Sequence, residues 1–509
     1  MDFALALLSG ALLALSFPKF GHPAFGWIAL APLLVALAHR PQSVRRSFTL
    51  GLLAGCVYFA GTLYWFVVTL TLYGGLSTPI ATFAAAMGLA YLALYPAVFA
   101  VIQARLVKAF GRSALLLAPA AWVATEMART YSPLDFPWEL LGYSQTTVLP
   151  IAQIASVVGV YGLSALVASV SAAAAYATLD RSGRWRLVCA VVAAIVLGTG
   201  VWGTLRIRRH TLTTAGIGIR VAVLQGNILQ DQKWDAGMRD AIMQRYIDMT
   251  REAIGRNAQF ILWPESATPV PYEEAVPHGE LIRRLAREAH VTMLIGSDQR
   301  EPVKPDLGTN PVEPAKLYNA AYLIRPDGST AAVYRKIHLV PFGEYVPFSR
   351  LLYFVGPLVE AAGDFVPGTE ATLLPVAGHM VSTAICYEVI YSGLMRSFVT
   401  RGSELLTTIT NDAWYGWSSA AYQHWEQASL RAVEEGRYLA RAANTGISGF
   451  VDPYGRVLQR SNMFQSAVLA EDVRFLTART IYSRIGDVVG WLSVALTVAA
   501  LLASRRKVN

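Results

Sequence analysis

Long apolar stretches occupy most of the first 205 residues and constrain the fold of this chain more than any other feature. A transmembrane helix needs about 20 mostly apolar residues, and shorter runs are tolerated where the bilayer thins. Seven stretches in this region and one near the C-terminus fit that description, which predicts an α-helical transmembrane bundle of eight spans. The expected spans are Phe3–Phe17, Pro23–Ala38, Phe48–Leu72, Ile80–Leu106, Ser113–Ala128, Leu149–Leu179, Leu187–Leu205 and Ile485–Ala503.

Charged residues are scarce and unevenly distributed along the chain. They make up 15% of the sequence, against roughly 25% in an ordinary soluble protein. Only five of the 34 acidic residues precede residue 206. This composition excludes a disordered, fibrous or wholly cytosolic protein, and it predicts a lipid-embedded part followed by a larger water-facing part.

The basic residues give the expected direction of the spans, because Lys and Arg collect in short cytoplasmic loops. Loops on one face of the predicted bundle carry twelve of them, whereas the short loops on the other face carry only Lys19 and Arg129. The N-terminus is therefore expected in the cytoplasm and residues 206–484 on the opposite side. Much of the net charge of +9 follows from this topology, so it does not indicate nucleic-acid binding. The twelve are Arg40, Arg45, Arg46, Arg105, Lys108, Arg112, Arg181, Arg184, Arg186, Arg505, Arg506 and Lys507.

Residues 219–470 read as an α/β domain, because short β-rich runs alternate with longer amphipathic ones. The expected strands are Ile219–Leu224, Gln259–Trp263, Val291–Gly296, Leu317–Ile324, Val381–Cys386 and Glu404–Thr410. The expected helices are Met238–Arg256, Gly279–His290, Ile390–Thr400 and Tyr422–Ala442.

Three segments of this domain place a reactive side chain at or near the end of an apolar strand. Glu265 stands in the sequence Trp-Pro-Glu-Ser, Lys336 stands shortly before Phe-Gly-Glu-Tyr-Val-Pro, and Cys386 begins Cys-Tyr-Glu. Each has an ordinary alternative when taken alone. Cys386 could be a small buried apolar residue, Lys336 a solvated charge, and Glu265 a cap on a turn.

Taken together, the three segments resemble the active-site motifs of the nitrilase superfamily of carbon–nitrogen hydrolases. The order Glu–Lys–Cys and the flanking residues carry this resemblance, which implies a nitrilase-like αββα sandwich. Such a domain between seven leading spans and one closing span resembles the apolipoprotein N-acyltransferase family. The expected domains are then 1–205 with seven transmembrane helices, 206–484 as the periplasmic catalytic domain, and 485–509 with the eighth helix and a cytoplasmic tail.

The resemblance implies acyl transfer through a thioester. Cys386 would be the nucleophile, Glu265 the general base and Lys336 the group that stabilises the oxyanion. The acyl donor would be a phospholipid, and the acceptor the α-amine of the N-terminal diacylglyceryl-cysteine of an apolipoprotein. The enzyme would lie in the bacterial inner membrane as a monomer, with no metal, no organic cofactor and no nucleic-acid partner.

Seven further residues are candidates for supporting roles. Glu344 would orient or charge-balance Lys336, with turn capping as its alternative. Tyr387 and Glu388 adjoin the nucleophile and could shape the substrate entrance, although Glu388 could instead form a structural salt bridge. Asn319 could position a polar group. The remaining three are aromatic residues of an expected lid that contacts acyl chains, with ordinary packing as the alternative: Trp234, Phe354 in the apolar stretch Leu351–Val359, and Trp414.

Two other functions fit parts of the pattern. A membrane-bound amidase or hydrolase would use the same three residues and release the acyl group to water. A transporter with an attached binding domain is disfavoured, because transport pathways place ionisable groups within the membrane and the expected spans hold almost none except Glu126. Cys386 is the only cysteine expected on the oxidising side, since Cys56 and Cys189 fall in spans, and an unpaired thiol there suggests a reactive one.

Overall fold

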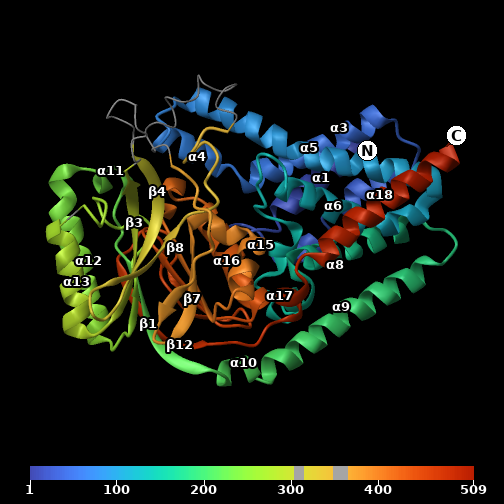
Figure 1. Ribbon diagram of the computed structural model, residues 1–509. Helices are drawn as coiled ribbons and strands as arrows, with labels where there is room; N and C mark the ends of the chain where they lie inside the picture. The colour runs from blue at the N-terminus through green and yellow to red at the C-terminus, as the bar shows by residue number, and fades with distance from the viewer. Residues whose placement is uncertain (275, 303–314, 348–364, 509) are drawn as a thin grey trace, which may run out of the picture. The chain divides into compact units, whose positions relative to one another are not determined.

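The computed structural model describes residues 1–274, 276–302, 315–347 and 365–508 (Figure 1). The chain divides into two compact units. The helical unit comprises Met1–His210, Trp417–Glu434 and Thr480–Asn509, and the sheet unit comprises Thr211–Gly416 and Glu435–Arg479.

The helical unit is built from apolar helices joined by short turns. Its helices are α1 (Asp2–Ala14), α2 (Ala31–Ala38), α3 (Val44–Thr62), α4 (Trp65–Leu72), α5 (Thr78–Phe110), α6 (Ala118–Thr130), α7 (Leu149–Ala152), α8 (Ala155–Leu179), α9 (Trp185–Arg208), most of α16 (Ala420–Glu435), α17 (Ile481–Ile485) and α18 (Val488–Val508), with the 3-10 turns η1 (Pro23–Ile28), η2 (Gly111–Leu117) and η3 (Leu141–Gln145).

By length and composition, fewer helices could cross a membrane than the eight expected from the sequence. Among the described residues, four helical stretches are long and apolar enough to cross, or five if the pair α3 and α4, bent by 55°, forms one span. The difference has two causes. The first two apolar runs fold into short helices, and the fourth and fifth runs form one helical stretch, Thr78–Thr130, interrupted only by η2. The eight crossings are therefore not confirmed.

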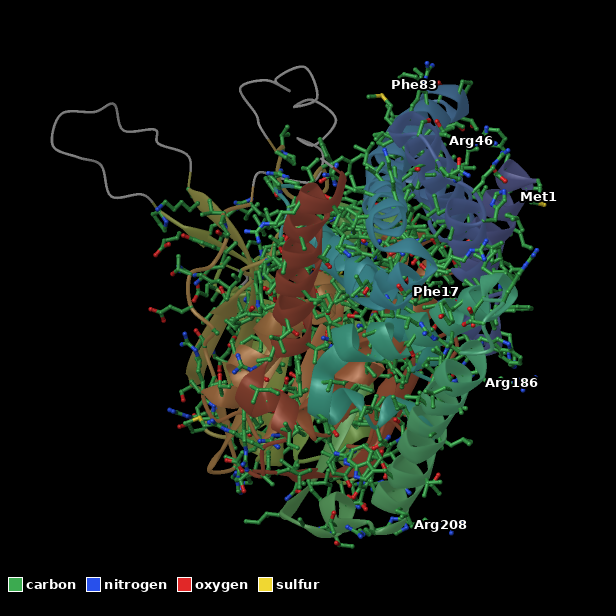
Figure 2. All side chains as sticks on the ribbon, turned by 90° about the vertical axis from the view of Figure 1, so that its right-hand side faces the viewer. Met1, Phe17, Arg46, Phe83, Arg186 and Arg208 are labelled. Carbon is green, nitrogen blue, oxygen red and sulfur yellow. The ribbon has the colours of Figure 1, made fainter. Side chains whose placement is uncertain are left out.

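Helix α9 has the surface that a lipid-facing helix requires. Leu187, Ile195 and Val201 are more than half exposed, and within α9 only Gly203 is buried. Arg186 and Arg208 lie toward the two ends of the helix (Figure 2). Apolar side chains between terminal arginines match the hydrocarbon core and the flanking headgroup layers of a bilayer.

Helices α3 and α5 approach closely because small residues line their contact. A Cβ added to Gly51 would lie 2.4 Å from the Pro96 carbonyl oxygen, and one added to Gly55 would lie 2.9 Å from the Ala93 Cα. Small residues at such a seam let two helix backbones gain van der Waals contact, which drives helix association in lipid.

A row of polar side chains on α16 is buried within the helical unit. Gln423 donates to the Thr62 carbonyl oxygen at 2.9 Å and accepts from the Trp138 indole at 2.8 Å. One turn later Gln427 donates to Glu139 at 3.0 Å, and Arg431 donates to the Tyr143 hydroxyl at 2.7 Å. The spacing of four residues places these side chains on one helix face.

The sheet unit contains two mixed six-stranded sheets in the described residues. The first has the order β12-β1-β2-β3-β4-β5, with β1, β2 and β3 parallel, and the second has the order β11-β10-β9-β8-β7-β6, with β7, β8 and β9 parallel. The bounds are β1 Ile217–Gln225, β2 Phe260–Leu262, β3 Thr292–Glu301, β4 Lys316–Ile324, β5 Thr330–Arg335, β6 Leu374–Val376, β7 His379–Ile385, β8 Leu405–Thr410, β9 Leu439–Ala443, β10 Gly449–Val451, β11 Val457–Arg460 and β12 Ala467–Phe475.

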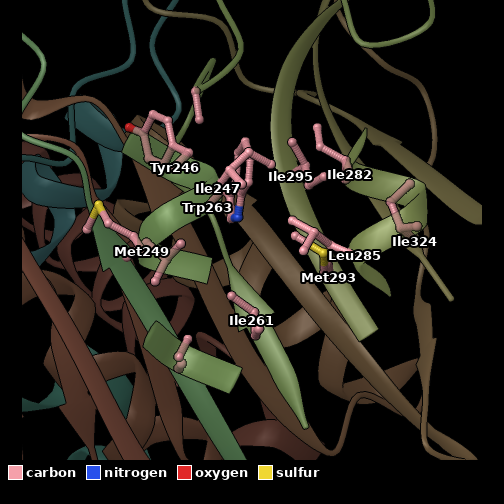
Figure 3. Close-up of a cluster of buried hydrophobic side chains, with 14 of the residues drawn as sticks. Tyr246, Ile247, Met249, Ile261, Trp263, Ile282, Leu285, Met293, Ile295 and Ile324 are labelled. Atoms are coloured by element: carbon pink, nitrogen blue, oxygen red, sulfur yellow. The ribbon is translucent and has the colours of Figure 1, made fainter. Parts of the chain in front are cut away.

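Helices cover the outer faces of these sheets, and the sheets contact one another through β1 with β9 and β4 with β7. The unit's helices are α10 (Thr211–Thr214), α11 (Gln230–Lys233), α12 (Arg239–Gly255), α13 (Val276–Ala289) and α15 (Ser392–Thr400). Helices α12 and α13 enclose the core shown in Figure 3, and α15 contacts β7. The result is the layered α/β arrangement expected from the sequence.

Trp263 anchors the core under α12. Its ring stacks on Tyr246 at a centroid distance of 4.9 Å, and its indole N–H donates to Thr250 at 3.0 Å (Figure 3). Met293 and Ile295 point to the same face because alternate residues of a strand share a side. This packing fixes the chain just before Glu265.

The prediction of one helix over Tyr422–Ala442 is wrong at its C-terminal end. Helix α16 stops at Glu435, Gly436 adopts a φ of 63°, and Leu439–Ala443 forms the buried strand β9. Glycine takes this left-handed conformation without steric cost and commonly ends a helix there. Strands β5, β6 and β10–β12 were not expected from the sequence, whereas each of the six expected strands is present.

Candidate active site

Glu265, Lys336 and Cys386 come together within the sheet unit. Glu265 lies three residues after β2, Lys336 directly follows β5, and Cys386 directly follows β7. Their exposed fractions are 6%, 1% and 5%. The Lys336 Nζ lies 3.5 Å from Oε1 of Glu265. Strands of both sheets thus contribute to one buried cluster.

Lys336 is held by two carboxylates. Its Nζ lies 2.9 Å from Glu344, whose Oε2 also accepts from the backbone N–H of Val340 at 2.8 Å. Burial alone would lower the pKa of Lys336, but Glu344 and Glu265 outweigh burial and raise it. The lysine is therefore a permanent cation. Glu344 contacts Lys336 and caps a turn, which combines both roles considered for it.

The Glu265 carboxylate has a fixed orientation. Its Oε1 accepts from the Asn319 side chain at 2.7 Å, and its Oε2 accepts from the Asn411 backbone N–H at 2.7 Å. Asn319 also donates to Glu344 at 3.0 Å. Its amide group therefore spaces the two glutamates and places both beside Lys336.

Cys386 has a strained backbone at a sharp change of direction. Its φ is 52°, a conformation that residues other than glycine seldom adopt, and it joins β7 to the 3-10 turn η7 (Cys386–Ile390). Burial raises the pKa of the Cys386 thiol, Glu265 raises it further, and Lys336 opposes both. The resting thiol is therefore protonated and needs a base before it can attack a carbonyl group.

Glu388 joins the chain around Lys336 to the chain around Cys386. Its carboxylate is fully buried, and it accepts from the Tyr334 hydroxyl at 2.8 Å, the Ile337 N–H at 2.6 Å and the Ile385 N–H at 2.8 Å. Burial raises the pKa of Glu388 to about 7, although these hydrogen bonds oppose the change. A fully buried carboxylate with these partners is suited to holding two loops together rather than to forming a substrate entrance.

The aromatic candidates differ in their exposure to solvent. Tyr387 is buried and packs edge-to-face on Tyr391 at 5.3 Å. Trp234 follows α11 and is 49% exposed, and Trp414 lies half-buried in the 3-10 turn η8 (Asp412–Tyr415). Phe354 lies outside the described residues, as does the rest of the apolar stretch Leu351–Val359.

Sequence analysis missed Lys233, Asp298 and Asn411, which surround Glu265. Lys233 donates to the Glu265 carbonyl oxygen at 3.3 Å, and Asp298 accepts from the Ser266 hydroxyl at 2.8 Å. Asn411 directly follows the expected strand Glu404–Thr410, so the strand-end pattern that indicated Cys386 also applies to it. No comparable local pattern indicates Lys233. Within the described ranges, no group of three or more His, Cys, Asp or Glu side chains could hold a metal ion.

Comparison with known proteins first defines the class. Residues 220–481 match the carbon–nitrogen hydrolase family, and residues 9–173 match the apolipoprotein N-acyltransferase N-terminal domain. The solved structures that resemble the chain include an amidase of the nitrilase superfamily from Nesterenkonia sp. AN1, with 22% identity and a TM-score of 0.39 over 53% of this chain and 94% of the amidase. By the two family matches, the chain combines a carbon–nitrogen hydrolase domain with an apolipoprotein N-acyltransferase N-terminal domain.

Full-length relatives then define the family. An apolipoprotein N-acyltransferase from Geobacter metallireducens is 38% identical over 99% of this chain and 96% of its own length. One from Methylococcus capsulatus is 35% identical over 99% of this chain and 96% of its own length. The chain belongs to the apolipoprotein N-acyltransferase family and is an acyltransferase, and its apolar helices indicate a membrane protein.

Proposed function

We propose that this enzyme moves a fatty acyl chain from a phospholipid to Cys386, and then to the α-amine of the N-terminal diacylglyceryl-cysteine of an apolipoprotein. The observation that carries this proposal is a buried, protonated thiol grouped with one oriented carboxylate and one permanent cation. These groups supply a nucleophile, a base and an electrostatic stabiliser. The names of the relatives indicate an apolipoprotein as the acceptor and an acyl group as the group transferred, and the phospholipid donor is part of the proposal.

In the first half-reaction, Glu265 accepts the thiol proton as the Cys386 sulfur attacks an ester carbonyl carbon of the phospholipid. The carbonyl oxygen becomes negatively charged, and Lys336 stabilises it. The intermediate then collapses, the bond between the carbonyl carbon and the glycerol oxygen breaks, and that oxygen takes the proton from Glu265. The products are an acyl thioester on Cys386 and a lysophospholipid. Losing one donor to such an oxyanion typically costs about 2.7–4 kcal/mol in the barrier.

In the second half-reaction, Glu265 removes a proton from the incoming α-amine, whose nitrogen attacks the thioester carbonyl carbon. Lys336 again stabilises the oxyanion. The carbon–sulfur bond breaks, an amide forms, and the Cys386 sulfur recovers the proton held by Glu265. One carboxylate therefore serves as base and acid in both halves, a contribution typically worth about 10²–10⁴ in rate.

We further propose eight membrane crossings, with 206–484 on the periplasmic side of the bacterial inner membrane. The helical stretch Thr78–Thr130 has 53 residues. At 1.5 Å per residue it would be roughly 80 Å long, more than twice the hydrocarbon thickness of about 30 Å. Its two helices, α5 and α6, contact each other, which supports two crossings rather than one. The short apolar helices α1 and α2, together with the broken pair α3 and α4, supply three of the remaining crossings.

The products distinguish acyl transfer from hydrolysis. Purified enzyme would be incubated with phospholipid and a synthetic diacylglyceryl-cysteine peptide, and the peptide and free fatty acid would be measured by mass spectrometry. Addition of one acyl mass to the peptide amine supports the proposal. Release of free fatty acid with an unmodified peptide would instead establish a hydrolase.

A further inference from the structure

Lys233 is a buried lysine beside the active site that the proposed chemistry leaves unassigned. It ends α11 and is 4% exposed. Two asparagines hold this segment in place. The Asn411 side chain donates to Gln230 at 2.8 Å, and the Asn444 side chain donates to the Ile228 carbonyl oxygen at 2.7 Å. Because Asn411 also donates its backbone N–H to Glu265, α11 is fixed relative to the base.

The contacts of Lys233 differ from those of Lys336. Its Nζ donates to the Glu265 carbonyl oxygen at 3.3 Å and lies 5.5 Å from the Trp234 ring centroid. Among the described residues, no carboxylate oxygen lies within 4.0 Å of it, and one of its three N–H donors is used. Burying an ammonium group without a paired anion costs desolvation free energy. A negative charge that develops nearby would offset part of this cost.

The charges around Cys386 supply that offset. Lys336 contributes one positive charge between Glu265 and Glu344, which contribute two negative charges. Those three residues have a net charge of about −1, and it stays near −1 when the thiol proton moves to Glu265, because the negative charge then lies on the sulfur or on the oxyanion. Adding Lys233 brings the sum for these residues close to zero before Asp298 is counted, both at rest and when the negative charge lies on the sulfur or the acyl oxygen. In a buried site of low dielectric constant, such a difference changes the barrier.

We propose that Lys233 is a second active-site cation, which holds the Glu265 peptide and stabilises the negative charge that develops on the Cys386 sulfur and on the acyl oxygen. It is a positioning residue, because it contacts the base through the base's carbonyl oxygen. The role in acyl transfer rests on the proposed function, whereas the effect on the thiol does not. The charged and titratable groups that face Lys233 are Glu265, Asp298 and Cys386.

The protonation equilibria agree with this assignment. Burial lowers the pKa of Lys233, while Glu265, Asp298 and the Cys386 sulfur oppose that change. A negative charge on Cys386 therefore favours the charged form of Lys233, and by reciprocity the charged lysine favours the thiolate. Burial also raises the pKa of Asp298 to about 6, so this carboxylate adds its negative charge mainly above that pH.

The test measures alkylation of Cys386 by iodoacetamide between pH 6 and 10, followed on the Cys386 peptide by mass spectrometry. Because the pKa of the Cys386 thiol is raised above its ordinary value, this range lies below the midpoint, and we expect Lys233→Met to slow alkylation about tenfold at each pH, as a rise of one unit in the thiol pKa would. Lys233→Arg, which keeps the charge, should stay within about twofold of the wild type. Lys316→Met changes an exposed lysine of the same unit and should leave the profile unchanged.

A second variant tests the opposite sign and does not depend on Lys233→Met folding. Asp298→Asn removes a negative charge above about pH 6 and should make alkylation of Cys386 faster there. An unchanged profile in folded Lys233→Met or in Asp298→Asn would overturn the proposal. Phospholipid-dependent acylation of Cys386 is measured in the same samples. Failure of the wild type to acylate, with iodoacetamide alkylation still slowed in Lys233→Met, would contradict the proposed function and leave the role of Lys233 standing.

Discussion

The backbone N–H of Asn411 donates to Oε2 of Glu265 at 2.7 Å, so a residue at the end of a strand in one sheet orients a carboxylate that follows a strand in the other. The second oxygen of that carboxylate is held by Asn319. Both carboxylate oxygens are thereby fixed before any substrate binds. A base oriented in this way loses little entropy when it takes up a proton, which favours catalysis.

Glu344→Gln should slow acylation of Cys386 without unfolding the protein. The substitution keeps the shape of the side chain but removes the carboxylate that pairs with Lys336 at 2.9 Å. A charge-assisted hydrogen bond is worth about 1.5–3 kcal/mol, so we expect a rate about 10- to 100-fold lower. The measurement is the rate of acyl-Cys386 formation from phospholipid.

Glu301→Gln is the matched control, because Glu301 pairs with Arg335 at 3.2 Å on an exposed part of the sheet unit. Equal rates in the two variants would contradict the role of Glu344.

Glu388 should make the sheet unit less stable as pH rises. Its folded pKa, about 7, lies above the ordinary value of 4.5. The folded state therefore binds the proton more tightly than the unfolded state does. This contribution to stability is complete below about pH 4.5 and is lost as pH rises through about 7. A difference of this size corresponds to roughly 3 kcal/mol.

The pH effect can be measured as the apparent Tm of the detergent-solubilised protein at pH 5, 6, 7 and 8. The Tm should fall over this range, and Glu388→Gln, which cannot titrate, should show a smaller fall. Glu404→Gln changes another glutamate of the unit and controls for its general titration. A wild-type slope in Glu388→Gln would exclude Glu388 as the source.

Gly51→Ala should destabilise the helical unit. The added Cβ would meet the Pro96 carbonyl oxygen at 2.4 Å, which forces α3 and α5 apart. Overpacking of this kind typically costs about 1–3 kcal/mol. Gly198→Ala on α9 is the matched control, because an added Cβ there meets nothing within 4 Å. Thermal unfolding in detergent should give a lower Tm for Gly51→Ala and a wild-type Tm for Gly198→Ala. An unchanged Tm in Gly51→Ala would contradict the close contact between α3 and α5.

Strand ends and flanking motifs in the sequence indicated three residues that the structure brings together. Glu265 and Cys386 follow strands that the sequence predicts, whereas Lys336 follows β5, which the sequence did not predict, and was identified by its flanking residues. Lys233 could not be found in this way, because its position depends on contacts with Asn411 and Asn444, which are distant in the sequence. The end of α16 was missed for a related reason, since β9 is stabilised by pairing with β8 and β10 rather than by its own residues.

Acylation of Cys386 itself tests the central claim most directly. The wild type, Glu265→Gln and Cys386→Ala would be incubated with phospholipid alone, and the peptide containing residue 386 would be examined by mass spectrometry. We predict one acyl mass on the wild-type peptide, none on Cys386→Ala, and formation at least about 100-fold slower in Glu265→Gln, because its thiol lacks a base. Absence of acylation in the wild type while Cys386 still reacts with iodoacetamide, or a wild-type rate in Glu265→Gln, would contradict this account.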